Sequence, residues 1–417
     1  MSFSPLKPEE PKDFINEVTN FILKHKDIPT SSDWAEANAR TLINAVCNIK
    51  CLGREAPFNM NSKTIIVSLS GMYKGFPIRA VVHPILYEVH KLTKKDFIIP
   101  SDRCSIEGII DWIHENPSGV EYRAEFTGLF AQFYHKKTYM AELEDYSKLF
   151  DGALIKRKIR KELISVVNYN FNLLGCTTSH LYKLLKMEMF IQGLGNRMDF
   201  IYDLDRELRD FRKNPFEFDY EEQQEQKKQI REYAQWLAQL HNFTQDLNMS
   251  VHGIEFLEFR KECLAEEDKL FRVYAMRLWS KAVSYAMTKE LSCFYPKMPF
   301  VPKGTNSIII RPKSVKYGIE TAKKYFVNFK KLILDWRVYQ EEHGEPSGVR
   351  VWSKERVYDI LINHGSKISA TQLKEIYKVP SPTKYLKALQ EEGKAEVDRT
   401  PNPYGVGTCI KMWYPCQ

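Results

Sequence analysis

Apolar residues along this chain follow two kinds of pattern, one helical and one extended. From Ala35 to Ile49 they recur every three or four residues, which predicts an amphipathic helix. From Thr64 to Leu69 they form a run of strand length, followed by an amphipathic segment that reaches His90. The pattern then predicts helix 106–114, strand 119–126, helix 140–150 and strand 163–175. Strands and helices that alternate in this way predict an α/β fold with a mostly parallel sheet between helices.

The second half of the chain is divided by a polar stretch and by a linker. Residues 211–247 are rich in Glu, Gln and Lys, which favours an exposed helix. An apolar strand at 308–310 leads into an expected helix at 314–334. Beyond a Gly-, Pro- and charge-rich linker, the pattern predicts helices at 353–363, 369–377 and 381–392 and strands at 394–399 and 408–414. Three helices followed by a two-stranded wing are typical of a winged-helix domain.

Length and composition set the scale of this organisation. The chain has 417 residues, of which 43% are hydrophobic and 27% charged, as in a globular protein of two or three domains. We expect an N-terminal helical region at 1–55, a sheet-containing module with a lid at 56–336, a linker at 337–350 and a winged-helix domain at 351–417.

No pattern typical of a membrane span or a metal site is found. The longest apolar runs are strand-length, far below the roughly 20 residues of a membrane span. The N-terminus lacks an apolar signal core, so we expect an intracellular protein, cytoplasmic or nucleoid-associated, without membrane partners. The eight cysteines include no Cys-x-x-Cys pair, and Cys47 and Cys51 are expected to be packed thiols. We expect no metal.

The strand at 64–69 ends in a turn with some features of a phosphate-binding loop. Such a loop reads Gly-x-x-x-x-Gly-Lys-Ser/Thr between a strand and a helix, where backbone N–H groups cradle phosphate. Residues 68–75 read Ser-Leu-Ser-Gly-Met-Tyr-Lys-Gly. Lys74 keeps the place of the lysine that neutralises phosphates, but Gly75 lacks the hydroxyl that would bind magnesium. The alternative interpretation is that Lys74 is an ordinary lysine of a surface turn.

Further segments accompany this turn in the order that a known family has them. They are the helix start Ser105-x-Glu-Gly108, the strand end Val120–Phe126, the turn Phe150-Asp-Gly152, and the run Leu173–Leu204. The last of these combines a buried strand with a polar tip and a Gly-x-x-x-Arg turn into another strand. Together the segments resemble the MCM helicases and the RecA-like AAA+ replication ATPases of phages and mobile elements, over roughly residues 35–335.

The resemblance implies a P-loop NTPase-like module and gives roles to particular residues. Glu125 stands where the family has the residue that polarises the attacking water, and Arg197 where an arginine reaches across a subunit interface to a nucleotide phosphate. The nucleotide contacts would come from Lys74, Gly71, Thr177 and Arg277. Ala124 replaces a magnesium-binding aspartate, so both magnesium positions are lost. We therefore expect weak binding of ATP or ADP and negligible hydrolysis.

Two basic clusters are candidates for nucleic-acid contacts. The first corresponds to a hairpin that faces the central channel in the related ATPases, and it consists of Lys156, Arg157, Lys158, Arg160 and Lys161. The second lies on the third helix and the wing of the C-terminal domain, and it consists of Thr383, Lys384, Lys387, Lys394 and Arg399. The formal net charge of +8, and the eleven Lys and Arg against seven Asp and Glu in residues 347–417, suit a polyanionic partner. The alternative is that these are solvated basic surfaces.

The sequence thus predicts a nucleic-acid-binding replication or recombination protein of a virus, plasmid or mobile element, built on a degenerate, inactive MCM-like ATPase module. The expected partners are DNA, duplex or single-stranded, and further copies of the chain in a ring or another replication ATPase. Two alternatives stay open: an active DNA helicase with an atypical nucleotide site, and a non-enzymatic protein-interaction adaptor.

Overall fold

The structure is a computed structural model, and it consists of two compact units. It describes residues 12–24, 30–53, 57–70, 72, 74–100, 105–129, 139–159, 162–185, 189–190, 193–204, 220–299, 306–343, 354–364, 367–376, 379, 382–400 and 410–416. The first unit spans Met1–Glu342 and the second His343–Gln417. The N-terminal helices belong to the first unit, together with the sheet.

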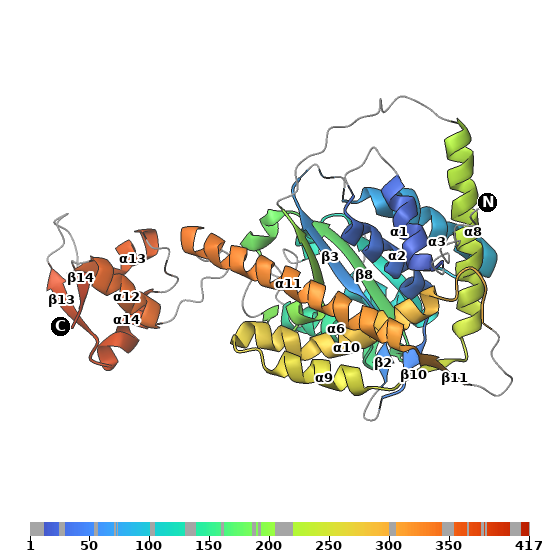
Figure 1. The fold of residues 1–417 in the computed structure, drawn as a ribbon. Helices are drawn as coiled ribbons and strands as arrows, with labels where there is room; N and C mark the ends of the chain where they lie inside the picture. The colour runs from blue at the N-terminus through green and yellow to red at the C-terminus, as the bar shows by residue number, and fades with distance from the viewer. Residues whose placement is uncertain are drawn as a thin grey trace, which may run out of the picture. The chain divides into compact units, whose positions relative to one another are not determined.

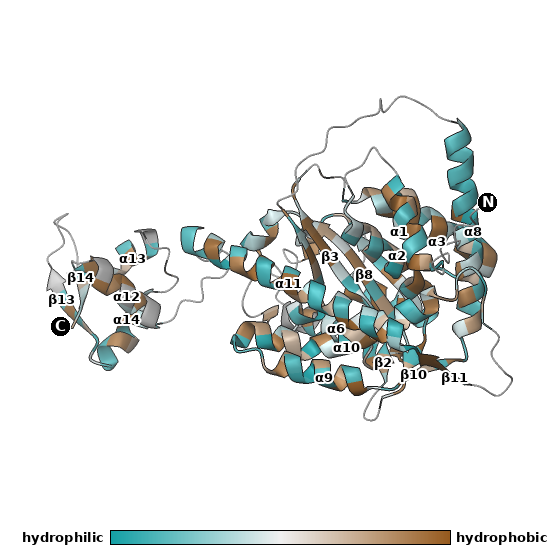
Figure 2. Ribbon diagram, viewed as in Figure 1, coloured by the Kyte–Doolittle hydropathy of each residue, from teal (hydrophilic) through white to brown (hydrophobic). Residues whose placement is uncertain are grey.

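A five-stranded parallel sheet forms the centre of the first unit, as the alternating pattern predicted (Figure 1). Its spatial order is β4 (Ile98–Ile99), β5 (Ser118–Arg123), β8 (Asn170–Thr177), β3 (Lys63–Ser68) and β9 (Asp199–Asp203). Every residue of β3 and β8 is buried, and both strands are coloured as largely apolar in Figure 2. Helices therefore cover both faces of the sheet, as is usual for parallel strands.

The path of the chain through this sheet reverses around β3. From β3 the chain passes to the edge strand β4, returns through β5 to β8, and then crosses beyond β3 to β9. β3 therefore pairs with β8 on one side and with β9 on the other. In open α/β sheets, ligands bind outside the carboxyl ends of the strands at such a reversal. The segments that follow β3, β5 and β8 are thus the first place to look for a site.

The helices of the described part of the first unit vary in length from 10 to 32 residues. They are α1 (Phe14–Lys24), α2 (Ser32–Val46), α3 (His83–Thr93), α4 (Ile106–Glu115), α6 (Tyr139–Asp151), α8 (Tyr220–Thr244), α9 (Ile254–Leu264), α10 (Lys269–Ser292) and α11 (Pro312–His343). α2 packs against β5 and β8, and α1 packs on α2. The first half of α8 is exposed and hydrophilic (Figure 2), as its composition predicted. A π-helical turn, Ile78–Val82, precedes α3.

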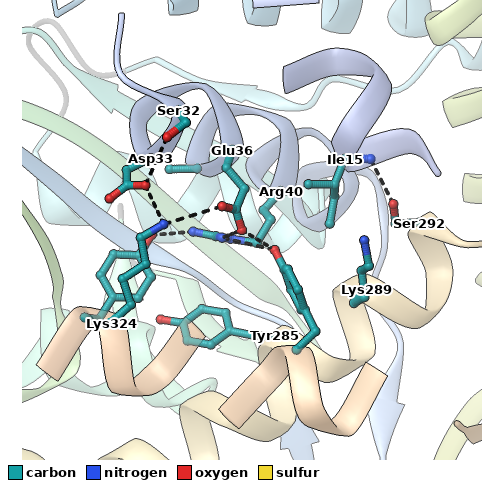
Figure 3. A network of polar contacts seen from close by, with 12 residues as sticks. Ile15, Ser32, Asp33, Glu36, Arg40, Tyr285, Lys289, Ser292 and Lys324 are labelled. Atoms are coloured by element: carbon teal, nitrogen blue, oxygen red, sulfur yellow. Dashed lines mark hydrogen bonds and ion pairs between the residues drawn. The ribbon is translucent and has the colours of Figure 1, made fainter. Parts of the chain in front are cut away.

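Buried polar contacts join α2 to the two last helices of this unit (Figure 3). Arg40 is 4% exposed and pairs with Glu36 at 2.6 Å. Its guanidinium also donates to the hydroxyls of Tyr317, at 3.2 Å, and Tyr325 on α11. On α10, Ser292 Oγ accepts from the Ile15 N–H of α1 at 2.8 Å. The N-terminal helices are therefore an integral part of the core.

A second, smaller sheet lies in the first unit. Of its short strands, the sequence predicted only the one at 308–310. Its order is β11 (Ser307–Ile310), β10 (Asn248–Val251), β1 (Lys50–Cys51) and β2 (Phe58–Asn59). β1 and β2 have only two residues each, too few to give a periodic signal.

Two expected boundaries are corrected by the structure. The single strand expected at 163–175 is two strands, because Asn168 adopts a left-handed conformation with φ of 56° between them. The first part, β7 (Glu162–Val166), pairs antiparallel with β6 (Ile155–Ile159), and the second part is β8. The linker expected from residue 337 begins as helix, because α11 continues to His343.

The second unit has its own core and its own sheet. Its elements are α12 (Lys354–His364), β12 (Ile368–Ser369), α13 (Ala370–Ile376), α14 (Pro382–Glu391), β13 (Ala395–Thr400) and β14 (Ile410–Pro415). The three strands pair antiparallel in the order β12-β14-β13. Leu361, Leu386 and Trp413 are buried together at its centre. The elements follow the order that the sequence predicted, with β12 added.

Candidate functional site

Three of the predicted site residues lie at the carboxyl edge of the large sheet. Lys74 follows β3, Glu125 follows β5, and Thr177 is the last residue of β8. Thr177 is fully buried, and its hydroxyl donates to Glu125 Oε1 at 3.2 Å. The charge of Glu125 also acts on the ammonium of Lys74. The parallel topology thus gathers at one edge residues that are about 50 positions apart along the chain.

The side chain of Lys74 folds back onto the carboxyl end of β3, the strand that precedes it. Its Nζ donates to the carbonyl oxygens of Leu69, at 2.7 Å, and of Ser68, at 3.3 Å. Burial lowers the pKa of Lys74 below its ordinary value, while Cys176 and Glu125 act in the opposite sense. A phosphate bound here would compete with two carbonyl oxygens for the ammonium. Gly71, the other residue predicted in this turn, lies outside the described residues.

The space next to Gly75 is taken by a tyrosine of β5. A Cβ atom added at Gly75 would overlap the hydroxyl of Tyr122, closer than real Cβ contacts allow. That hydroxyl also hydrogen-bonds the thiol of Cys176, whose pKa is raised to about 12 because the thiol is buried. A serine or threonine, which the standard loop has at this position, would therefore require Tyr122 to move. Gly75 is thus packed against a side chain of β5, which is separated from β3 by β8 in the sheet.

The helix start at Ser105 has the geometry of a capped N-terminus. Ser105 Oγ accepts a hydrogen bond from the Gly108 N–H at 3.3 Å. Glu107, in the first turn of α4, pairs with Arg157 of β6. This segment therefore supports the basic hairpin.

Arg197 and Arg277, by contrast, lie at the opposite, amino edge of the sheet. The Arg197 guanidinium binds Asp151 in a bidentate manner, at 2.8 and 2.5 Å, and Arg277 Nη1 lies 3.2 Å from the same carboxylate. Burial raises the pKa of Asp151, but the hydrogen bonds and charges of the two arginines and of Lys63 outweigh it and hold the pKa below the ordinary value.

Glycines make this arginine cluster possible. Gly193 has φ of +87° and its carbonyl accepts from Arg197 Nη1 at 2.7 Å. Gly152 has φ of +63°, which lets α6 end at Asp151 with a left-handed residue. The Asp-Gly and Gly-x-x-x-Arg turns, noted separately in the sequence, are thus the two halves of one ion-paired cluster.

The structure therefore divides the predicted nucleotide residues between two edges. Lys63 begins β3 and lines a cavity with Arg197 and Arg277, whereas Lys74 bonds the carbonyl at the other end of that strand. Because β3 spans the sheet from one edge to the other and rises by about 3.3 Å per residue, the two edges are about 17 Å apart. Within one chain, Arg277 is not a neighbour of Lys74.

The first basic cluster lies on the antiparallel hairpin of β6 and β7. Lys156 is exposed, whereas Arg157 is held by two carboxylates, Asp145 of α6 and Glu107 of α4. The side chain of Lys158, and the residues Arg160 and Lys161, lie outside the described part. Of the five predicted cations, Lys156 is thus the one that the described structure presents to solvent.

The second basic cluster is partly on α14 and partly on the wing strands. Thr383, Lys384 and Lys387 are exposed on α14. Lys394 pairs with Glu392 at 3.2 Å, which reduces its availability to a phosphate. The side chain of Arg399 lies outside the described residues.

Sequence reasoning did not single out Tyr122 and Lys63, and it noted Asp151 only as part of a turn. Tyr122 fills the space at Gly75, Asp151 neutralises two arginines, and Lys63 is buried in the cavity at the amino edge. The signal for Lys63 is a lysine directly before an apolar strand. For Tyr122 the sequence holds no signal, because its partner is 47 positions away.

Comparisons with known proteins leave this geometry as the main guide. No protein-family model matches the chain, and a search of curated proteins found no relative. Among the residues that the structure describes, no helix is both long and apolar enough to cross a membrane. The same part of the chain contains no group of three or more His, Cys, Asp or Glu side chains arranged to hold a metal ion.

Proposed function

We propose that this chain is a nucleic-acid-binding protein of replication or recombination, built on a degenerate P-loop ATPase-like module with a C-terminal winged helix. The observation that carries the proposal is the convergence of Lys74, Glu125 and Thr177 at the carboxyl edge, where the strand order reverses. A virus, plasmid or mobile element is the source that the resemblance suggests.

Hydrolysis at this edge would be very slow. Phosphoryl transfer depends on positioning and on charge neutralisation by magnesium. The two positions that would hold the metal are Gly75 and Ala124, and the first of them has no room for a side chain while Tyr122 stays in place. ATP or ADP would be bound weakly, through Lys74, without efficient turnover.

Nucleic-acid binding would use the exposed cations of both units. Lys156 on the hairpin and Lys384 and Lys387 on α14 are solvent-exposed and suited to phosphate contacts. Three helices and a β-hairpin around a separate core, in the order that a winged helix has, support duplex binding by the second unit.

One observation favours a second candidate, a non-enzymatic adaptor. Arg197, the residue that would reach the nucleotide of a neighbouring subunit, is engaged by Asp151 through two hydrogen bonds. Charge-assisted bidentate pairs of this kind are strong, so Arg197 would have to leave a good partner before it could act in a ring.

The test combines nucleotide hydrolysis and DNA binding on one preparation of the full chain. The proposal predicts salt-sensitive DNA binding, measured by fluorescence anisotropy, together with negligible ATP hydrolysis. DNA-stimulated hydrolysis that disappears in Lys74→Ala would instead identify an active helicase. Fluorescence anisotropy that does not change when protein and DNA are mixed at low salt would favour the non-enzymatic adaptor.

A further inference from the structure

A polar cavity of about 240 Å³ lies at the amino edge of the sheet, inside the first unit. Its charged wall consists of Lys63, Asp151, Arg197, Asp199, Arg277 and Lys281. Four of these side chains are basic and two are acidic, so the wall carries two positive charges in excess when all six are ionised. Unbalanced charge in a buried site is costly, and a ligand of opposite sign relieves that cost.

Lys63 differs from the other cations of this wall in its surroundings. Its side chain is 7% exposed and its Nζ lies 5.7 Å from the centroid of the Phe150 ring. Among the described residues it forms no hydrogen bond or ion pair, whereas Lys281 is 2.7 Å from Asp199. Burial lowers the pKa of Lys63 to about 7. The charges of Asp151 and Asp199 act against this lowering, and those of Lys281 and Arg197 act with it.

We propose that this cavity binds a phosphate dianion, as inorganic phosphate or as the terminal group of a small phosphate monoester, with Lys63 donating to its oxygens. Two negative charges match the excess of the wall, which a phosphodiester with one charge would not. The volume equals that of about eight liquid waters, enough for a phosphate group with a small substituent. Arg277 is 38% exposed and has one of its five N–H donors on Asp151, so it supplies further donors at the site.

This proposal does not rest on the nucleotide site, because the two lie at opposite edges of the sheet. It makes a separate prediction about protons. A dianion beside Lys63 favours the charged ammonium, so binding raises the pKa of Lys63 and takes up a proton near pH 8. A phosphate at Lys74 would leave Lys63 unchanged.

The experiment is calorimetric titration of the full chain with inorganic phosphate at pH 8, in two buffers of different ionisation enthalpy. The variants are Lys63→Met, Arg277→Gln and, as the comparator at the other edge, Lys74→Ala. Lys63→Met keeps the length of the apolar part of the side chain and removes a buried ammonium group, so the variant is expected to fold. We expect proton uptake with the wild type, binding at least tenfold weaker in Lys63→Met and Arg277→Gln, and unchanged binding in Lys74→Ala.

Competition identifies the source of the phosphate. ADP or a single-stranded oligonucleotide that displaces inorganic phosphate in the Lys74→Ala background would assign the cavity to that larger ligand's phosphate and overturn the small-ligand proposal. Absence of phosphate binding, or equal affinity in Lys63→Met, would overturn the site itself. Loss of binding in Lys74→Ala alone would place the phosphate at the carboxyl edge, which contradicts this inference and supports the nucleotide site.

Discussion

The contact between Gly75 and Tyr122 allows a direct test of whether Tyr122 excludes a side chain from this turn. Gly75 lies outside the left-handed region, so an alanine there meets only the steric obstacle of the Tyr122 hydroxyl. The ring carbon that carries this hydroxyl is 3.7 Å from the position of the added Cβ, an ordinary contact. Removal of the hydroxyl alone therefore makes room for the side chain.

The expected loss of stability in Gly75→Ala follows from the kind of steric overlap. Overpacking in a filled core costs about 1–3 kcal/mol, and the hydroxyl is at the far end of a side chain that can tilt, so we expect about 1 kcal/mol for Gly75→Ala. Gly128 offers a matched control, because an added Cβ has no atom within 4 Å. There Gly→Ala is expected to stabilise by about 0.4–1 kcal/mol through the unfolded chain.

A double-mutant cycle measured by urea unfolding tests the reasoning. Gly75→Ala should destabilise the wild type and should become neutral or stabilising when Tyr122→Phe is present, so the two changes are coupled by about 1 kcal/mol. Additive effects, or a Gly75→Ala variant that behaves like Gly128→Ala, would refute the view that Tyr122 excludes a side chain from this position. In the same background, Gly75→Thr with Ala124→Asp tests whether the two residues of the standard loop and strand confer the proposed nucleotide hydrolysis.

Three further predictions concern charge. The pKa of Lys63 is about 7 in the folded state and about 10.4 in the unfolded chain, so the unfolded chain binds more protons between these two pH values. The free energy of unfolding should therefore rise with pH across this window. Lys63→Met should remove that part of the rise, as measured by urea unfolding. Lys156→Gln should make the slope of log affinity against log salt less negative by about 0.9 without a change in melting temperature, whereas Arg157→Gln should cost about 1 kcal/mol of stability because it removes the ion pairs of Arg157 with Asp145 and Glu107. Residues 343–417 should fold alone, and Lys384→Ala with Lys387→Ala should weaken duplex binding of that fragment; a folded fragment that ignores DNA at low salt would point to a protein-binding role.

The periodicity of the sequence was sufficient for the larger elements and insufficient where single residues decide. The long apolar patterns correctly predicted α2, β3, α4 and α6 to within a few residues, because their buried faces recur with a fixed period. The break at Asn168 was missed, since apolar residues of strand type lie on both sides of this one left-handed residue. The two-residue strands β1 and β2 depend on partners in the smaller sheet and have no local signal.

The candidate site shows the same division. The parallel topology follows from the alternating pattern, and with it the meeting of Lys74, Glu125 and Thr177 at one edge. The pairing of Arg197 with Asp151 joins residues 46 positions apart, and it depends on two left-handed glycines that only coordinates reveal. Sequence reasoning therefore found Arg197, Arg277 and the turn that holds Asp151, but neither their mutual neutralisation nor Lys63.

The burial of Arg40 has a consequence for how the chain is made. Its hydrogen-bond partner Tyr325 is 285 positions further along the sequence, so α2 leaves the ribosome long before α11 exists. Until α11 is synthesised, the guanidinium of Arg40 has no tyrosine hydroxyl to which it can donate, and the apolar faces beside Arg40 stay exposed to water. Contacts of such long range slow folding and prolong the exposure of these faces. The first unit thus completes its core only after its last helix is synthesised, and a chain truncated before residue 312 should aggregate rather than fold as a shortened domain.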